Sequence, residues 1–154
     1  MRYVVAASAM AIAQGNGGDT YLYVLAAANN PVRILGWGVS FDGKTAGEAK
    51  ILCELCTSSV AGAGTSAGAV TEVKLDADRS ETIQGAGQYG PYTEEPTALS
   101  VIHCEYVDNQ AGWKEYFPDG YEIVVTGGKA ACIRLTSPAA MTSCNAACWL
   151  LCDE

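Results

Sequence analysis

The residues best suited to chemistry in this chain are its seven cysteines. Cys53 and Cys56 form a CxxC motif, a spacing found in zinc half-sites and in thiol redox centres. A zinc site needs a second pair of ligands, which Cys144 and Cys148 are spaced to supply. Both segments have strand patterns, however, so residues three apart point to opposite faces and residues four apart lie about 13 Å from each other. The spacing therefore argues against a metal or redox centre.

The number of cysteines also bears on disulfides. An odd count in a chain of 154 residues is a poor disulfide framework. We expect most of the thiols to be small buried apolar groups in a protein made in a reducing cytosol. The alternative hypothesis is one or more bridges in a particle that oxidises after its release.

His103 is the only histidine. It lies in a predicted strand beside Cys104, and strand alternation places Glu105 on its own face. A cysteine–histidine pair would be one use for it, but a single strand histidine is far more often a structural residue. The chain contains no GxSxG, P-loop, HExxH or dinucleotide-binding motif. We therefore expect no catalytic residues, no bound metal and no cofactor, and predict that the protein is not an enzyme.

The segments between residues 89 and 117 collect aromatic and acidic side chains. Aromatic residues are enriched at the centres of protein interfaces, and paired acids in a loop suit capture of basic groups on a partner. The alternative is that the acids are simply solvated and that two of the aromatics belong to the core. The predicted interface residues are Tyr89, Tyr92, Glu94, Glu95, Trp113, Tyr116 and Phe117.

The charge balance excludes some partners. The chain has 17 acids against 9 bases, a formal net charge of −8. A nucleic-acid binder needs a basic footprint, and an anionic membrane surface also attracts cations, so both are disfavoured. The N-terminal run after Arg2 resembles a short signal peptide, but its Ala-rich composition and single positive charge favour a strand over residues 2–13. No stretch reaches the ~18–20 apolar residues of a membrane span.

Short apolar runs separated by turn residues fill the whole chain. They predict one all-β domain over residues 1–154, a β-sandwich, jelly roll or β-barrel of about eight to nine antiparallel strands with long surface loops. Residues 58–69 and 76–96 are predicted as the long loops, since the first is rich in Gly, Ser and Ala and the second is polar. The predicted strands cover residues 2–13, 20–27, 32–41, 50–57, 70–75, 98–107, 130–136 and 144–152; residues 113–117 form a short aromatic segment, and residues 121–126 have a strand-like pattern.

The clearest strand is Val32–Phe41, which ends at the Asp42-Gly43 turn. Alternation places its large side chains on one face and mostly small ones, including Gly36 and Gly38, on the other. We expect the large face to be the centre of the core and the bare face to admit the close approach of another backbone. The large residues are Leu35, Trp37, Val39 and Phe41.

Three stretches carry a resemblance to a known group of proteins: LGWGVSFDG at 35–43, EPTALSVI at 95–102 and IRLTSPAA at 133–140, followed by a C-terminal strand. Together they resemble small head-decoration or minor capsid proteins encoded in the structural gene modules of tailed bacteriophages, mainly those of actinobacteria. The cysteine-rich composition and the Gly-rich 58–69 segment depart from that pattern.

The resemblance implies a virion structural protein. It would be assembled in the host cytoplasm, bind the major capsid protein lattice on the capsid exterior as a decoration (cement) protein, and self-associate as a homotrimer. Residues 76–96 and the N-terminal strand are the expected contact segments. The alternative function is a phage tail, fibre, receptor-binding or carbohydrate-binding β-module.

Overall fold

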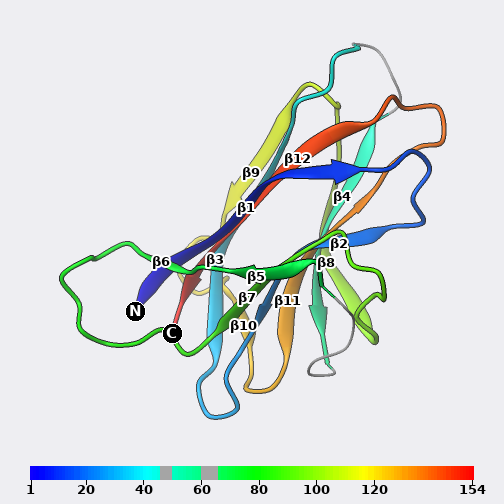
Figure 1. Cartoon of the computed structure of the whole chain (residues 1–154). Coiled ribbons are helices and arrows are strands. Elements are labelled where there is room, and N and C mark those ends of the chain that lie inside the picture. The colour runs from blue at the N-terminus through cyan, green and yellow to red at the C-terminus, as the bar shows by residue number, and fades with distance from the viewer. Residues whose placement is uncertain (46–49, 60–65) are drawn as a thin grey trace.

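The computed structural model describes residues 1–45, 50–59 and 66–154, and over these residues the chain is all β. Two antiparallel sheets face each other, and neither closes into a barrel (Figure 1). The predicted β-sandwich is confirmed, and the barrel alternative is wrong, because each sheet ends in free edge strands. Twelve strands lie in the described residues, more than the eight or nine predicted.

The first sheet, sheet A, has the strand order β6-β1-β12-β3, with β9 and β10 lying end to end along the far side of β3. Its strands are β6 (Val73–Lys74), β1 (Arg2–Ile12), β12 (Cys144–Asp153), β3 (Val32–Phe41), β9 (Gly112–Tyr116) and β10 (Ile123–Val125). The second, sheet B, has the order β5-β7-β2-β11-β4-β8. Its strands are β5 (Gly68–Val70), β7 (Ala86–Tyr89), β2 (Asp19–Leu25), β11 (Ala130–Thr136), β4 (Ile51–Ser58) and β8 (Leu99–Val107).

The main core lies between the sheets and includes the expected face of β3. Trp37, Val39 and Phe41 are buried there, against large residues of β1 and β2 such as Tyr3 and Tyr21. Trp37 is fully buried. The prediction that this strand is the structural centre of the molecule is therefore confirmed.

The alternation of β3 breaks at Leu35. Gly36 pairs with Leu151 of β12, but the next partner, Cys152, pairs with Ile34, so Leu35 is an extra residue in a β-bulge. The bulge changes which parity faces inward, so Ile34 is fully buried and Leu35 only half-buried. The predicted position of Leu35 on the core face is therefore wrong.

The two predicted long loops contain strands that their composition concealed. Within residues 76–96 the chain forms β7 on the edge of β2, and β5 pairs with β7 at positions 68–70. Gly87 of β7 passes so close to the core that a Cβ there would lie 2.7 Å from Val5 Cγ1. Pairing and close approach hold these glycine-containing segments, where local strand propensity is low. The part of the 58–69 prediction at residues 60–65 lies outside the described residues.

The predicted strand over residues 70–75 is divided between the sheets. Val70 ends β5 in sheet B, whereas Val73 begins β6, which pairs with β1 in sheet A. Glu72 lies at this crossover, and its Oε1 accepts a hydrogen bond from the backbone N–H of Gly87 at 2.5 Å. One predicted strand therefore becomes a link between the two sheets at their shared edge.

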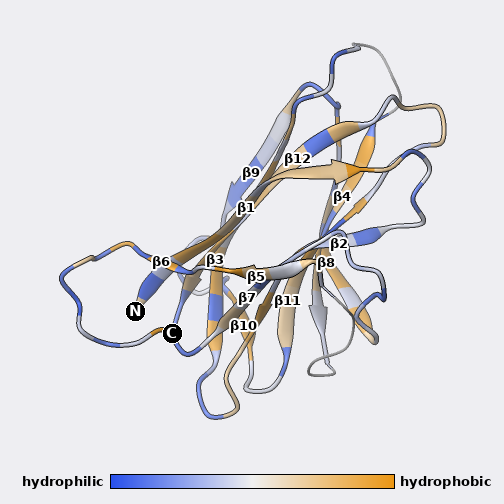
Figure 2. Ribbon diagram, viewed as in Figure 1, coloured by the Kyte–Doolittle hydropathy of each residue, from blue (hydrophilic) through white to orange (hydrophobic). Residues whose placement is uncertain are grey.

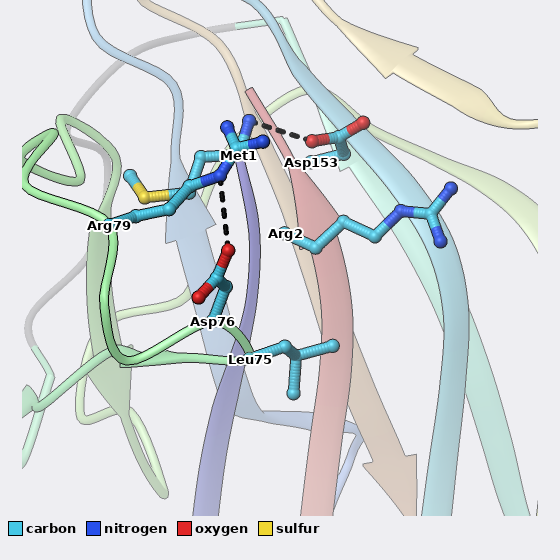
Figure 3. A pocket seen from close by; sticks show the side chains of 6 residues that line it. All are labelled: Met1, Arg2, Leu75, Asp76, Arg79 and Asp153. Atoms are coloured by element: carbon cyan, nitrogen blue, oxygen red, sulfur yellow. Dashed lines mark ion pairs between the residues drawn. The ribbon is translucent and has the colours of Figure 1, made fainter.

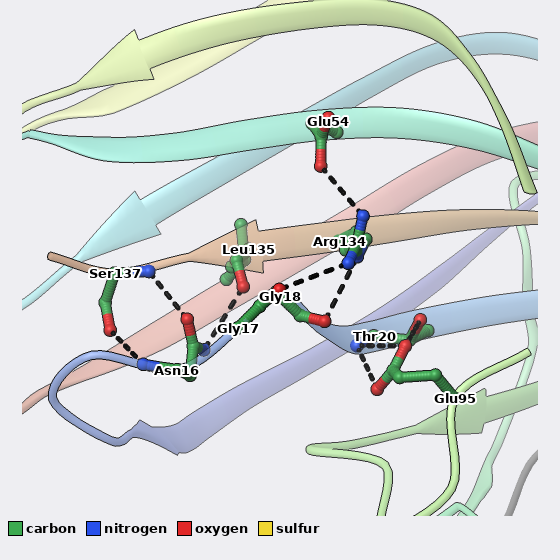
Figure 4. A network of polar contacts seen from close by, with 9 residues as sticks. All are labelled: Asn16, Gly17, Gly18, Thr20, Glu54, Glu95, Arg134, Leu135 and Ser137. Atoms are coloured by element: carbon green, nitrogen blue, oxygen red, sulfur yellow. Dashed lines mark hydrogen bonds and ion pairs between the residues drawn. The ribbon is translucent and has the colours of Figure 1, made fainter.

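Polar contacts on sheet B attach the turn after β1 to β11 (Figure 4). The Asn16 side-chain amide donates to the Leu135 carbonyl at 3.2 Å, and Asn16 Oδ1 accepts from the Ser137 N–H at 2.6 Å. Arg134 Nε donates to the Gly18 carbonyl at 3.1 Å, and its guanidinium lies 3.6 Å from Glu54 Oε2. The exterior of sheet B is therefore polar here, as expected for a sheet face in water.

Candidate interaction surfaces

The exterior of sheet A carries apolar side chains that are open to solvent, whereas the apolar cluster on the exterior of sheet B is buried beneath the segment that carries Tyr92. One register line crosses five neighbouring strands through Val73, Val4, Leu151, Gly36 and Tyr116. A sandwich normally places polar residues on this side. We call this surface the apolar outer face, and its members are Val4, Ala6, Gly36, Gly38, Val73, Leu75, Tyr116, Trp149 and Leu151.

The large side chains of the apolar outer face are open to solvent. Val73 is 60% exposed, Leu75 58% and Tyr116 59%, while Trp149 and Leu151 are half-buried. In Figure 2 the hydrophobic colouring extends along β1, which lies near the centre of this sheet. Contiguous exposed apolar residues of this kind mark interaction sites on otherwise soluble folds.

The two glycines of β3 make the centre of this face flat. A Cβ at Gly38 would lie inside the Trp149 indole, and a Cβ at Gly36 would lie 2.8 Å from the Tyr116 ring. The two aromatic rings therefore lie close over the glycine backbone, with their centroids 5.5 Å apart and their planes tilted by 35°. The bare face of β3 therefore admits a close approach, both of these two rings and, at Gly36, of the backbone carbonyl of Glu115, which would lie 2.7 Å from a Cβ there.

Cations surround the apolar outer face. Arg2, Asp153 and Arg33 lie on one register line at one end, and Lys114 pairs with Gly38 nearer the other end. Asp153 Oδ1 already lies 2.8 Å from the amino nitrogen of Met1. The rim thus presents three cationic side chains together with the paired Asp153 and, near Arg33, Glu122, on a chain whose net charge is −8.

A hollow of about 550 Å³ adjoins this face at its Arg2 end (Figure 3). Arg79 lies inside the hollow with its Nε 3.4 Å from Asp76 Oδ2, whereas the Arg2 side chain points away from Asp76. The hollow is lined by Met1, Arg2, Leu75, Asp76, Arg79 and Asp153. Two of its positive charges are paired, Arg79 with Asp76 and the Met1 amino group with Asp153, and the hollow continues the surface at this end.

A second exposed apolar feature is the edge of sheet B formed by β8, which we call the β8 edge. Val101 is 50% exposed, Ile102 49% and Tyr106 66%. The strand has nine residues and contains no proline or lysine, the residues that commonly protect an edge from pairing with another chain. The β8 edge is therefore suited to contact with a second strand or a second copy.

His103 of β8 closes the gap between the two sheets. Its Nδ1 contacts Glu115 Oε2 of β9, and its ring lies edge-on to Trp37 at 5.6 Å and to Trp113 at 6.1 Å between centroids. This contact between His103 and Glu115, flanked by two indoles, joins sheet B to sheet A at this side of the sandwich. The histidine therefore has a structural role, the interpretation that the sequence favoured.

The predicted interface aromatics of β9 divide between surface and interior. Tyr116 lies on the apolar outer face, while Trp113 and Phe117 are half-buried and pack against the main core. Trp113 also lines a hollow of about 270 Å³ together with Trp149 and Lys114. Tyr116 is thus the predicted residue of this group that the structure places on the surface, and an interface role for all three stays a prediction.

The predicted residues of the 89–95 segment mostly support the chain's own structure. Tyr89 is half-buried against the main core, and Tyr92 is 6% exposed and packs on Tyr23 at 6.0 Å between ring centroids. Glu95 accepts hydrogen bonds from the Thr20 N–H at 2.9 Å and from its hydroxyl at 2.6 Å (Figure 4). Among the four predicted interface residues of this segment, only Glu94 is largely exposed. The structure therefore brings none of these residues together with Tyr116.

The sequence prediction missed the residues that make up most of the apolar outer face. Trp149 and Leu151 stand on the parity of β12 opposite to its cysteines, and Val4 stands opposite Tyr3 and Val5 on β1. The available signal was that both strands are apolar on both parities. Such a strand needs cover on both sides, and the described part of the chain covers only one.

The two thiols of the predicted motif lie in different surroundings, and Cys53 gives no sign of reactivity. Cys53 lies in the main core and Cys56 in a second cluster on the other side of sheet B, so the predicted divergence of the CxxC pair is confirmed. Burial raises the pKa of the Cys53 thiol to about 12 and that of the Cys152 thiol to about 12. Both are neutral near pH 7 and therefore poor nucleophiles and poor metal ligands.

Three further findings bear on function. Among the described residues, no three His, Cys, Asp or Glu side chains are grouped so that they could hold a metal ion. In the same residues, no helix is long and apolar enough to span a membrane. No family model and no curated protein matches the chain.

Proposed function

We propose that the protein is a non-enzymatic structural protein of a virion, a decoration (cement) protein that binds the major capsid protein of a tailed bacteriophage through its apolar outer face. The single observation that supports this most strongly is the exposed apolar exterior of sheet A. The resemblance of three segments to phage head-decoration and minor capsid proteins supplies the particular partner.

The size of the apolar outer face suits a protein partner. The face crosses five strands at ~4.8 Å spacing, and its members extend over about four residues along each strand at ~3.3 Å per residue, which gives a surface of roughly 300 Å². A standard interface uses about 800 Å² per partner, so one copy binds modestly on this face alone. Binding in several linked copies would multiply that affinity without any new contact.

The charges select the partner's chemistry. Arg2, Arg33 and Lys114 lie at the margin of the apolar centre; of the acids beside them, Asp153 is paired with the Met1 amino group and Glu122 lies near Arg33. The complementary surface is therefore apolar with acidic groups at its margin. A second copy in the same orientation would oppose cations to cations, so we assign this face to the capsid and not to self-association.

The β8 edge is the proposed self-association surface. Its exposed Val101, Ile102 and Tyr106 lie on sheet B, on a different sheet from the apolar outer face, although the two surfaces adjoin where His103 of β8 contacts Glu115 of β9. The two surfaces can therefore be occupied at the same time. Use of the β8 edge for a homotrimer would place three apolar outer faces on the capsid lattice together.

The experiment is a binding assay with capsids that lack the protein. Tyr116→Glu and Tyr106→Glu form a matched pair, because both tyrosines are more than half exposed but lie on different surfaces. We expect Tyr116→Glu to lose capsid binding in co-sedimentation while keeping the native oligomeric mass. We expect Tyr106→Glu to lower the oligomeric mass and to weaken capsid binding only by the loss of multivalency.

Two results would contradict the proposal. Wild-type protein that does not bind such capsids at micromolar concentration would exclude the decoration role. Capsid binding that is lost in Tyr106→Glu monomers and unaffected by Tyr116→Glu would exclude the assignment of the apolar outer face. Circular dichroism of each variant checks that the fold is retained.

The second candidate is a carbohydrate- or receptor-binding module of the tail or fibre. The observation in its favour is the neighbouring Tyr116 and Trp149 rings beside the 270 Å³ hollow that Trp113 lines. Exposed aromatic rings can stack on the apolar faces of sugars. Tryptophan fluorescence that changes on titration with host cell-wall glycans, in a protein that does not bind capsids, would favour this candidate.

A further inference from the structure

Cys56 and Cys132 are direct neighbours across two central strands of sheet B. Cys56 of β4 and Cys132 of β11 are register partners in an antiparallel pair. Directly opposed residues in such a pair have Cα atoms ~4.5–5.5 Å apart, within the 4.4–6.8 Å range of disulfides. A side-chain hydrogen bond already joins the two thiols. The two side chains therefore lie together on one face of sheet B, at a backbone spacing that a disulfide can span.

The pair lies outside the main core. Both cysteines are fully buried in a small cluster on the exterior of sheet B, with Tyr23 and Tyr92. The segment that carries Tyr92 is held over the sheet by the bond from its N–H to the Thr20 carbonyl at 3.1 Å and by the contacts of Glu95 with Thr20. Local opening of this segment would expose the thiols while the two-sheet core stays closed.

We propose that Cys56 and Cys132 form a disulfide when the protein meets an oxidising environment, and that this bond locks β4 to β11. The oxidant is a small-molecule disulfide such as oxidised glutathione. The Cys56 thiolate attacks one sulfur of the oxidant, forms a mixed disulfide and releases one glutathione thiolate. The Cys132 thiolate then attacks the Cys56 sulfur and releases the second. The two thiol protons end on two molecules of reduced glutathione.

The order of attack follows from the hydrogen bond between the thiols. The bond from Cys132 lowers the pKa of the Cys56 thiol, and the same bond together with burial raises the pKa of the Cys132 thiol. Cys56 is therefore the first nucleophile and Cys132 the resolving thiol. Each of the other five cysteines, all of them among the described residues, pairs in register only with residues other than cysteine.

The test is a disulfide map of the full chain after oxidation. Purified protein is kept with excess oxidised glutathione, blocked with iodoacetamide, and cut after glutamate and then with trypsin. Cleavage after Glu54 separates Cys53 from Cys56, so the expected product is peptide 55–72 joined to peptide 130–134. The same sample is expected to melt roughly 10 °C higher than the reduced protein, because the bond closes a loop of about 75 residues.

Two variants complete the test. Cys132→Ala is expected to lose both the joined peptides and the thermal shift, whereas Cys104→Ser, at an exposed cysteine, is expected to keep both. If Cys132→Ala does not fold, the wild-type map alone decides. Peptide 130–134 recovered fully alkylated after prolonged oxidation, or joined to the peptide that carries Cys53, would overturn the proposal. Capsid binding is not part of this readout, so it stands apart from the proposed function.

Discussion

Replacement of Trp37 by alanine tests the separation of core and exterior in sheet A. Trp37 is fully buried, and its ring lies edge-on to His103. Removal of a fully buried tryptophan costs ~3–5 kcal/mol, from a total stability of ~5–15 kcal/mol. We expect the free energy of unfolding to fall by about 4 kcal/mol and Tm to fall by roughly 8–16 °C for a chain of this size.

Trp149→Ala is the matched control, because the same side chain is removed from the opposite face of the same sheet. Trp149 is half-buried on the apolar outer face, where it covers Gly38 and contacts Tyr116. Its loss leaves no cavity between the sheets. We expect the free energy of unfolding of the isolated chain to change by about 1 kcal/mol or less.

The assay is urea unfolding followed by circular dichroism, with the midpoint and slope compared among the wild type and the two variants. An unchanged slope shows that the variants expose the same surface on unfolding. Equal destabilisation by Trp149→Ala and Trp37→Ala would refute the reasoning, because the apolar outer face would then act as core of the isolated chain. A Trp37→Ala variant of near wild-type stability would refute it as well.

Three more predictions follow from the contacts described above. Gly38→Ala is expected to displace the Trp149 indole and so to shift its fluorescence, while the secondary structure by circular dichroism stays the same; unchanged emission would contradict the close packing. Hydrogen bonds from Asn145 lower the pKa of Asp42 below its ordinary value of 3.8. The ionised Asp42 carboxylate therefore adds its full stability to the folded state above pH 3.8, and this stability is lost as the pH falls through the lowered pKa. The urea midpoints of wild type and Asp42→Asn should therefore converge in acid. A difference between the two midpoints that stays constant down to low pH would contradict the predicted loss of this stability on acidification. In native protein at pH 8 we expect the exposed Cys104 to react first with a thiol reagent and Cys53 to react only on unfolding, because burial raises the pKa of Cys53; rapid labelling of Cys53 would be the opposing result.

Much of the sandwich could be predicted from alternation and turn residues. The bounds of β3 and β11 agree with their predicted ranges, because each combines β-branched or aromatic residues with clear turns at its ends. The bulge at Leu35 could not be predicted. It arises from the register between β3 and β12, which lie more than 100 residues apart in the sequence, and local alternation carries no information about it.

Strands that depend on tertiary pairing were also beyond the sequence. β7 includes Gly87 and Gln88, which have little strand propensity, and it forms because the edge of β2 and the strand β5 pair with it. The same pairing determines the position of the 90–95 segment that follows. Tyr92 and Glu95 are therefore bound to residues of β2, although an aromatic and an acid in a loop suggested surface contacts.

The candidate site could be predicted only in part. Tyr116 was identified because exposed aromatic residues favour interfaces, but its neighbours Val4 and Leu151 are ordinary strand residues when each is taken alone. What makes them a surface is the order β6-β1-β12-β3-β9, which joins segments from both ends of the chain. Strand order is a long-range property that a single sequence does not contain.

The most direct test of the central claim is oxidative footprinting of the protein on capsids and in free solution. Trp149 and Tyr116 lie on the apolar outer face, whereas Tyr121, 76% exposed in the turn between β9 and β10, serves as the reference. The proposed function predicts that binding to the capsid protects Trp149 and Tyr116 at least several-fold relative to Tyr121. Equal oxidation of Trp149 and Tyr116 in the bound and free protein would contradict it.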